Sequence, residues 1–218
     1  RNPENYSKPI ADRFEYKLTA KDAPDATDLY RKILAEAEDK SITIVTVGPL
    51  FNIMALLESE ADEFSVLNGN NLIQKKVKEF VIMGGNFPEG ENEWNFNGNM
   101  PGVTKFVLEN LTSPITFSGF EVGAQIKTGA ILNEKDKNTP LYVGYKYFSE
   151  HAPWMKKYYK GIVLDNASYD QTALLYAVRR GEGVYWDKIT GGICIADDNG
   201  GNKWEPKRAA THSYLKLI

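Results

Sequence analysis

Short apolar runs alternate with amphipathic stretches along most of the chain. Residues 41–47 (SITIVTV) and 80–83 (FVIM) are rich in apolar and β-branched side chains and stop at glycine, so each predicts a buried strand. Residues 114–117 predict a further strand, and apolar positions three and four apart predict helices at 26–37 and after Pro101. The alternation predicts an α/β fold whose open, mostly parallel sheet carries helices on both faces.

The remaining segments give weaker patterns. Residues 1–24 contain prolines at positions 3, 9 and 24 and lack periodicity, which predicts a surface arm. Residues 120–129 predict a helix closed by glycine, and the aromatic-rich stretch 138–159 predicts helical core contacts. The apolar string GGICIA predicts a late strand with Cys194 as a buried structural thiol, whereas His212 is predicted at the surface or packed against the tail.

The loop that follows residues 80–83 is crowded with polar side chains. In open α/β sheets ligands bind beyond the carboxyl ends of the strands, and the glycines at 84 and 85 allow close approach there. Carboxamides and a carboxylate can together accept from and donate to vicinal hydroxyls, so the loop predicts a site for a polyhydroxyl ligand. An ordinary Asn/Gly-rich surface loop is the alternative. The side chains concerned are Asn86, Asn92, Glu93, Trp94, Asn95 and Asn97.

Composition narrows the class of protein. A chain of 218 residues with 42% hydrophobic content can bury a substantial core and predicts a single domain, 1–218. The net charge of −3 leaves no basic face suited to nucleic acid, so we expect no such partner. No apolar run approaches the roughly 20 residues that span a bilayer, so we expect no membrane segment. The single cysteine excludes an internal disulfide, and the compartment stays open.

The order of residues after the second strand resembles the inosine-uridine type nucleoside hydrolases. In that family MGG is followed by a loop and then Glu-Phe-Asn; here MGG is followed by a loop and then EWNF. The resemblance implies that Glu93 and Asn95 hold ribose hydroxyls. It also implies that a further asparagine of the loop binds the ribose, and Asn92 or Asn86 would be that residue.

Two further segments resemble the same family. TVGPL resembles a strand that runs into Gly-Pro-Leu-Thr-Asn, which implies that the backbone carbonyl of Val47 ligates calcium, although Phe51 stands where the family usually has Thr. The apolar helix ALLYAV is preceded by Asp170, where the family has a calcium-ligating Asp that acts in catalysis. Tyr169 replaces the His that commonly precedes this Asp. A first-turn carboxylate that complements the helix dipole is the alternative reading of Asp170.

The resemblance implies a reaction, a cofactor and an assembly. We expect hydrolysis of the N-glycosidic bond of a ribonucleoside with a calcium-bound water, in a homo-oligomer of two or four subunits. The family begins with an aspartate cluster, Asp-x-Asp-x-x-x-Asp-Asp, which the chain lacks, so we expect a domain that is incomplete at its N-terminus. A non-catalytic nucleoside- or sugar-binding module, or a truncated fragment of such a hydrolase, is the alternative.

Overall fold

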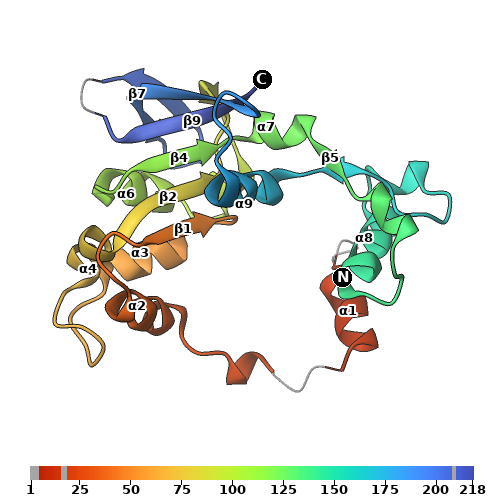
Figure 1. Ribbon diagram of the computed structural model, residues 1–218, viewed down its shortest axis with the longest axis horizontal. Helices are drawn as coiled ribbons and strands as arrows, with labels where there is room; N and C mark the ends of the chain where they lie inside the picture. Colours follow the sequence, from red (N-terminus) through yellow and green to blue (C-terminus); the bar gives the residue numbers. More distant parts are fainter. Residues whose placement is uncertain (1–4, 16–18, 208–209) are drawn as a thin grey trace. The chain divides into compact units, whose positions relative to one another are not determined.

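The computed structural model describes residues 5–15, 19–207 and 210–218 (Figure 1). The chain divides into two compact units. The smaller unit comprises Arg1–Ala23 and Ile126–Ser168, and the larger, here called the sheet unit, comprises Pro24–Gln125 and Tyr169–Ile218. The sequence predicted one domain, and the two units are described separately.

A seven-stranded sheet organises the sheet unit, in the order β1-β2-β4-β9-β7-β8-β3. The parallel strands are β1 (Ile42–Thr46), β2 (Val77–Met83), β4 (Ile115–Ser118) and β9 (His212–Leu217). The antiparallel additions are β7 (Trp186–Ala196), β8 (Asn202–Pro206) and β3 (Glu89–Gly90). The α/β class with a mostly parallel central sheet, predicted from the sequence, is confirmed. The antiparallel edge was not predicted.

Helices connect and cover these strands. They are α2 (Ala26–Glu36), α3 (Phe51–Glu58), α4 (Gly69–Lys76), α5 (Trp94–Asn97), α6 (Val103–Asn110), α7 (Phe120–Gln125) and α9 (Tyr169–Arg179). Side chains cap three of them: Asp25 accepts from the N–H groups of Thr27 and Asp28 at the start of α2, Asn68 caps α4, and Glu93 caps α5. The helix predicted at 120–129 ends early, because Lys127–Thr128 pairs as a short strand, β5.

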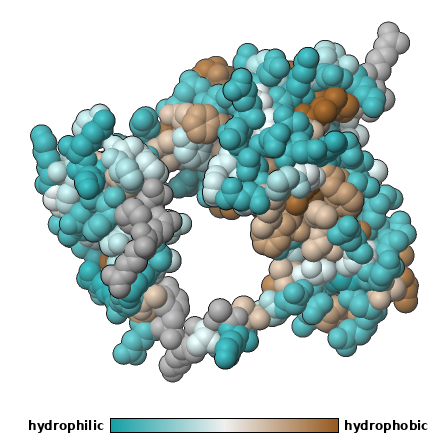
Figure 2. Space-filling view, turned by 180° about the vertical axis from the view of Figure 1, so that it is seen from behind, coloured by the Kyte–Doolittle hydropathy of each residue, from teal (hydrophilic) through white to brown (hydrophobic). Residues whose placement is uncertain are grey.

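The core lies between the sheet and the helices. Leu56, Val77, Phe80, Val107 and Phe117 have no exposed surface and belong to one core cluster, so apolar side chains of α3 and α6 pack with those of strands β2 and β4. Hydrophilic residues cover most of the face shown in Figure 2, with apolar patches on the larger unit. No helix in the described residues is both long and apolar enough to cross a membrane.

Two residues of the C-terminal strands, Cys194 and His212, had predicted positions. Cys194 is buried in β7, as predicted, and burial raises the pKa of its thiol to about 12. Of the two positions predicted for His212, at the surface or packed against the tail, the surface position is wrong: the residue is 6% exposed, because it opens β9 between β4 and β7. Its Nδ1 accepts from the Cys194 N–H at 3.1 Å. Burial lowers the pKa of His212 to about 4, so its ring is neutral near physiological pH.

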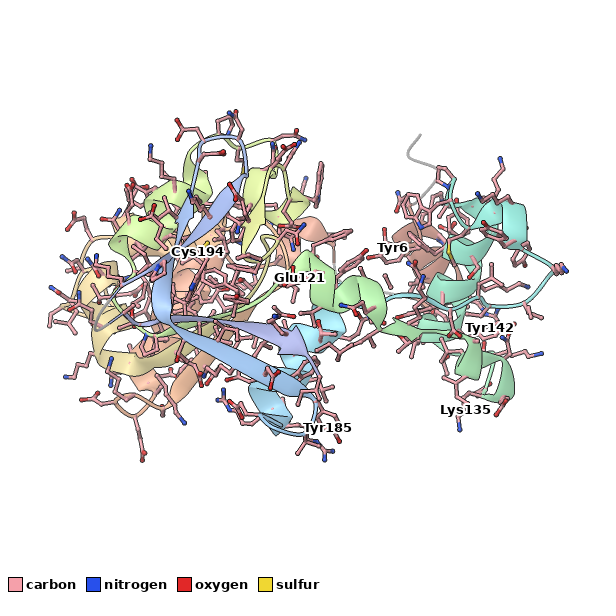
Figure 3. The ribbon with its side chains drawn as sticks, turned by 90° about the horizontal axis from the view of Figure 1, so that it is seen from above. Tyr6, Glu121, Lys135, Tyr142, Tyr185 and Cys194 are labelled. Carbon is pink, nitrogen blue, oxygen red and sulfur yellow. The ribbon has the colours of Figure 1, made fainter. Side chains whose placement is uncertain are left out.

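The smaller unit packs two helices together. Within the surface arm predicted for residues 1–24, a short helix forms, α1 (Ser7–Arg13), and none of its residues is buried. Pro9 lies in its first turn, where no intrahelical N–H bond is lost. Residues 1–4 and 16–18 lie outside the described part. Helix α1 contacts α8 (Pro140–His151), and the ring of Tyr6 meets that of Phe148 edge to face at 6.2 Å. Figure 3 labels Tyr6 and Tyr142 in this unit. Residues 140–151 of the aromatic stretch predicted at 138–159 thus form α8, whereas Trp154 and Tyr158 lie beyond this helix and are exposed, so core contacts are wrong for these two.

A buried arginine ties α2 to the loop before α4. Arg31 is 2% exposed, and its guanidinium pairs with both carboxylate oxygens of Asp62. It also donates to Ser59 Oγ at 2.9 Å and to the carbonyls of Ser65 and Leu67 at 3.1 and 2.9 Å. The hydrogen bond from Arg31 holds the pKa of Asp62 at about 2, below its ordinary value of 3.8.

This pair predicts a pH dependence of stability. Because the pKa of Asp62 is lower in the folded state, its contribution is complete above about pH 4 and is lost as the pH falls towards about 2. We therefore expect Asp62→Asn to lower the free energy of unfolding near neutral pH and to match the wild type near pH 2. Urea unfolding of the wild type and of D62N between about pH 2 and neutral pH measures the two free energies. Asp12→Asn, which removes an exposed ion pair with Lys8, should change the free energy of unfolding little at any pH. If the difference in unfolding free energy between the wild type and D62N were the same at every pH, the assignment would be contradicted.

Candidate functional site

The carboxyl ends of three parallel strands meet at one edge of the sheet. The register pairs Thr46 of β1 with Ile82 of β2, and Met83 of β2 with Ser118 of β4. The loops that follow these strands therefore start side by side. Two of the three begin with segments singled out in the sequence: Val47 after β1, and the Gly-Gly and Asn-rich loop after β2. A ligand site at this edge is the usual arrangement in an open α/β sheet.

Helix α9 brings its first turn to the same edge. It packs against β1, β2 and β4, and Figure 1 shows it beside the carboxyl ends of these strands. Ser118 Oγ and Thr172 Oγ1 are hydrogen-bonded at 3.0 Å, which joins the end of β4 to this turn. A Cβ at Gly123 would lie 2.5 Å from the Tyr169 ring, so glycine permits the close contact between α7 and α9. Tyr169 and Asp170 are thus held at the loop edge.

Glu93 is the most constrained side chain of the site. It is 8% exposed, and its Oε2 accepts from the N–H groups of Gly85 (3.0 Å), Asn95 (3.0 Å) and Phe96 (3.1 Å), which also caps α5. Burial raises the pKa of Glu93, and the backbone hydrogen bonds act in the opposite direction. The Trp94 N–H is a further backbone donor that lowers this pKa. The backbone therefore fixes Oε2, and none of the three hydrogen bonds from Gly85, Asn95 and Phe96 uses Oε1.

The asparagines of the loop differ in their surroundings. Asn95 is 8% exposed, and its Nδ2 donates to the Met83 carbonyl at 3.1 Å. Asn86 is half-buried directly after the Gly-Gly pair, while Asn92 is exposed. Glu93 and Asn95 are thus built into the floor of the loop. Which of Asn86 and Asn92 supplies a further amide stays a prediction.

Tyr169 lies close to Glu93. Burial raises the pKa of the Tyr169 hydroxyl, and the negative charge of Glu93 raises it further. The Tyr169 ring stacks on Phe120, with centroids 5.1 Å apart and planes inclined by 24°. Phe120 is 44% exposed and was missed in the sequence; its place directly after the glycine that ends the 114–117 strand was the available signal. The two rings form an aromatic wall beside the buried carboxylate.

Asp170 and Val47 are more open. Asp170 follows Tyr169 in the first turn of α9 and is exposed as a residue, although partial burial of its carboxylate raises its pKa. Val47 is 44% exposed at the end of β1, which α9 contacts. The structure therefore brings Tyr169 to Glu93 and places Asp170 next to Tyr169, at the sheet edge where Val47 begins its loop.

These residues do not by themselves fit a calcium ion. Calcium takes about six to eight oxygen ligands, whereas the Val47 carbonyl and the Asp170 carboxylate offer at most about three. No group of three or more His, Cys, Asp or Glu side chains suited to a metal occurs in the described part of the chain. Thr46 Oγ1, one residue before Val47, is buried and has no hydrogen-bond partner among the residues that the structure describes, so the end of β1 has an unsatisfied oxygen there.

A second, half-buried acid near this edge was not predicted. Glu121, labelled in Figure 3, lies in the first turn of α7. Its Oε2 accepts from the Phe87 N–H at 3.1 Å, and its Oε1 is buried without a partner among the described residues. Burial raises the pKa of this carboxyl. Its partner lies 34 positions away, which a local motif does not reveal.

Comparison with solved structures places the fold. A plant nucleoside hydrolase superposes with a TM-score of 0.67 at 17% identity, over 94% of this chain and 66% of that protein. An inosine-guanosine nucleoside hydrolase superposes with a TM-score of 0.59 at 16% identity, over 88% of this chain and 62% of that protein. An inosine-uridine preferring nucleoside hydrolase from Bacillus anthracis superposes with a TM-score of 0.57 at 14% identity, over 90% of this chain and 62% of that protein.

The chain thus spans between 62% and 66% of the length of these proteins, and the likeness shows a shared fold. No curated protein matches the chain. The profile of the inosine-uridine preferring nucleoside hydrolases matches residues 3–212, nearly the whole sequence. The chain belongs to the inosine-uridine preferring nucleoside hydrolase family.

Proposed function

We propose that the full-length protein hydrolyses the N-glycosidic bond of a ribonucleoside to a free base and ribose, and that this chain supplies the ribose-binding part of the site. The observation that carries the proposal is the Glu93 carboxylate. Three backbone N–H groups hold its Oε2, and Oε1, which takes part in none of these three bonds, lies with it beside an aromatic wall at the carboxyl edge of the sheet.

The chemistry of the reaction suits such a carboxylate. Glycosidic cleavage develops positive charge on the sugar ring, which flattens as the bond to the base breaks. A fixed carboxylate that accepts from the ribose hydroxyls strengthens those bonds as charge develops, and only contacts that tighten in the transition state raise the rate. Asn95, whose amide nitrogen is already bonded to Met83, offers its amide oxygen to a neighbouring hydroxyl.

The Tyr169–Phe120 stack suits the base of the nucleoside. Aromatic faces stack on purines and pyrimidines, and both rings lie at the sheet edge beside Glu93. The pKa of Tyr169 is raised above its ordinary value of 10.0, so this phenol is a poor proton donor near neutral pH. In this proposal Tyr169 positions the base and does not protonate it.

Calcium is the cation that the family resemblance implies. The Val47 carbonyl and the Asp170 carboxylate are the groups of this chain that would contact it, and a cation in such a site lowers the pKa of a bound water. Because these two groups provide too few oxygens, the ion needs further ligands. Assembly as a dimer or tetramer stays a prediction.

The proposal is tested by ribose release from the full-length protein. We expect free ribose and free base from inosine or uridine, with turnover that stops when calcium is chelated and returns when calcium is restored. A reducing-sugar assay and chromatography of the base measure both products. A folded protein that releases ribose from no nucleoside would overturn the proposal.

A non-catalytic nucleoside-binding module is the second candidate. The observation in its favour is that the described residues bring no third metal-binding side chain to Asp170. Calorimetry separates the candidates: a module would bind ribose or a nucleoside equally with and without calcium and would form no free base.

A further inference from the structure

Asn202 binds the backbone of Asn86 with both polar atoms of its side chain. Asn202 Oδ1 accepts from the Asn86 N–H at 2.9 Å, and Asn202 Nδ2 donates to the Asn86 carbonyl at 3.0 Å. Asn202 is 5% exposed and is the first residue of β8. A planar amide presents a donor and an acceptor together, so it takes the place of a neighbouring strand for this one residue.

The residues on either side of Asn86 are held in the same manner. The Gly85 N–H donates to Glu93 Oε2, and the Gly85 carbonyl accepts from the Phe120 N–H at 2.8 Å. After Asn86, the Phe87 N–H donates to Glu121 Oε2. The three N–H groups of residues 85–87 and the carbonyls of residues 85 and 86 are therefore paired with partners from three other segments of the chain: Glu93, the start of α7 and Asn202.

This arrangement fixes the loop in one conformation. Buried backbone groups need hydrogen-bond partners, and residues 85–87 lie beyond the last paired residue of β2. Gly85 has a φ of +75°, and a Cβ there would lie 3.0 Å from Asn202 Oδ1, so the loop and Asn202 are in direct contact. A shift of Asn86 would carry the Gly85 N–H away from the Glu93 carboxylate.

We infer that Asn202 is a positioning residue of the ribose site: it fixes the backbone at Asn86, and through it the Gly85 N–H that orients Glu93 and the direction of the Asn86 side chain. This inference rests on the proposed function of Glu93. Nothing in the family profile match or the fold comparison assigns a role to Asn202, whose strand lies in the antiparallel part of the sheet.

Asn202→Asp tests the inference with a nearly isosteric change. The carboxylate keeps an acceptor for the Asn86 N–H but loses the donor and sets a negative oxygen against the Asn86 carbonyl. In the full-length protein we expect the dissociation constant of inosine, measured by calorimetry, to rise about tenfold. We also expect faster hydrogen exchange at residues 84–90 in the ligand-free protein. Asn202→Ala should show both effects more strongly.

Ser213→Ala is the matched control. It removes a buried side-chain hydrogen bond of 2.9 Å to Thr116 between β9 and β4, and neither residue is bonded to the loop. We expect S213A to lower the melting temperature without changing exchange at residues 84–90 or the affinity for inosine. The same result for S213A and N202D in both readouts would assign Asn202 a merely structural role.

The outcomes separate this inference from the proposed function. If the wild type binds neither inosine nor ribose, the proposed function fails, and Asn202 then has no ribose site to position. If the wild type binds inosine and N202D binds it equally well, the positioning role is overturned while the proposed function stands. Faster exchange in N202D with unchanged affinity also overturns it, because the loop would then move without consequence for the ligand.

Discussion

Glu93→Gln in the full-length protein is expected to weaken ribonucleoside binding and to slow ribose release by about a hundredfold or more. A hydrogen bond to a charged group is worth about 1.5–3 kcal/mol, and Glu93 Oε1 is placed to accept from at least one ribose hydroxyl. The neutral amide of Gln loses this charge where the sugar becomes positive. Calorimetry with inosine and the rate of ribose release measure the two effects.

The same substitution should leave the fold almost unchanged. Gln retains an oxygen that accepts from the N–H groups of Gly85, Asn95 and Phe96, so we expect the free energy of unfolding to fall by less than about 1 kcal/mol. Glu91→Gln is the matched control, because Glu91 lies in the same loop but is exposed. Turnover of E93Q equal to that of E91Q would remove Glu93 from the site.

Asp170→Asn is expected to cost the full-length protein its calcium affinity and about two orders of magnitude in turnover. The prediction distinguishes a ligand from a residue that only complements the helix dipole, which is worth about 0.3–1 kcal/mol of stability. Asn is nearly isosteric and keeps one oxygen, so any large loss is due to the missing charge. Titration with calcium, followed by calorimetry, provides a readout that does not depend on activity.

Asp28→Asn is the control for the helix dipole. Asp28 occupies the first turn of α2, as Asp170 occupies that of α9, and it lies away from the candidate site. D28N and D170N should each change stability only slightly, and only D170N should lower calcium affinity. Equal calcium affinity in wild type and D170N would leave Asp170 with the dipole role alone.

The elements of the site could be predicted because their signals are local. The strands at β1, β2 and β4 follow from short apolar runs that stop near glycine, and parallel strands align their carboxyl ends. This placed Val47 and the loop of Glu93 at one edge. The residue order around EWNF then predicted the family, which the profile match confirms.

The missed features depend on contacts between distant residues. Asn202 lies 116 positions from Asn86, and Glu121 lies 34 positions from Phe87, so no periodicity or motif links either pair. His212 was expected at the surface or packed against the tail; its burial follows from a strand order that the sequence does not specify. A complete calcium site was not found, because the described residues lack the necessary group of ligands.

The most direct test is a crystal structure of the full-length protein with a bound, unhydrolysed ribonucleoside analogue. We predict that the vicinal ribose hydroxyls lie within hydrogen-bonding distance of Glu93 Oε1, that the base contacts the Tyr169–Phe120 stack, and that Asp170 faces the same pocket. A sugar bound elsewhere, or Glu93 and Asp170 opening onto opposite sides of the sheet unit, would contradict the account.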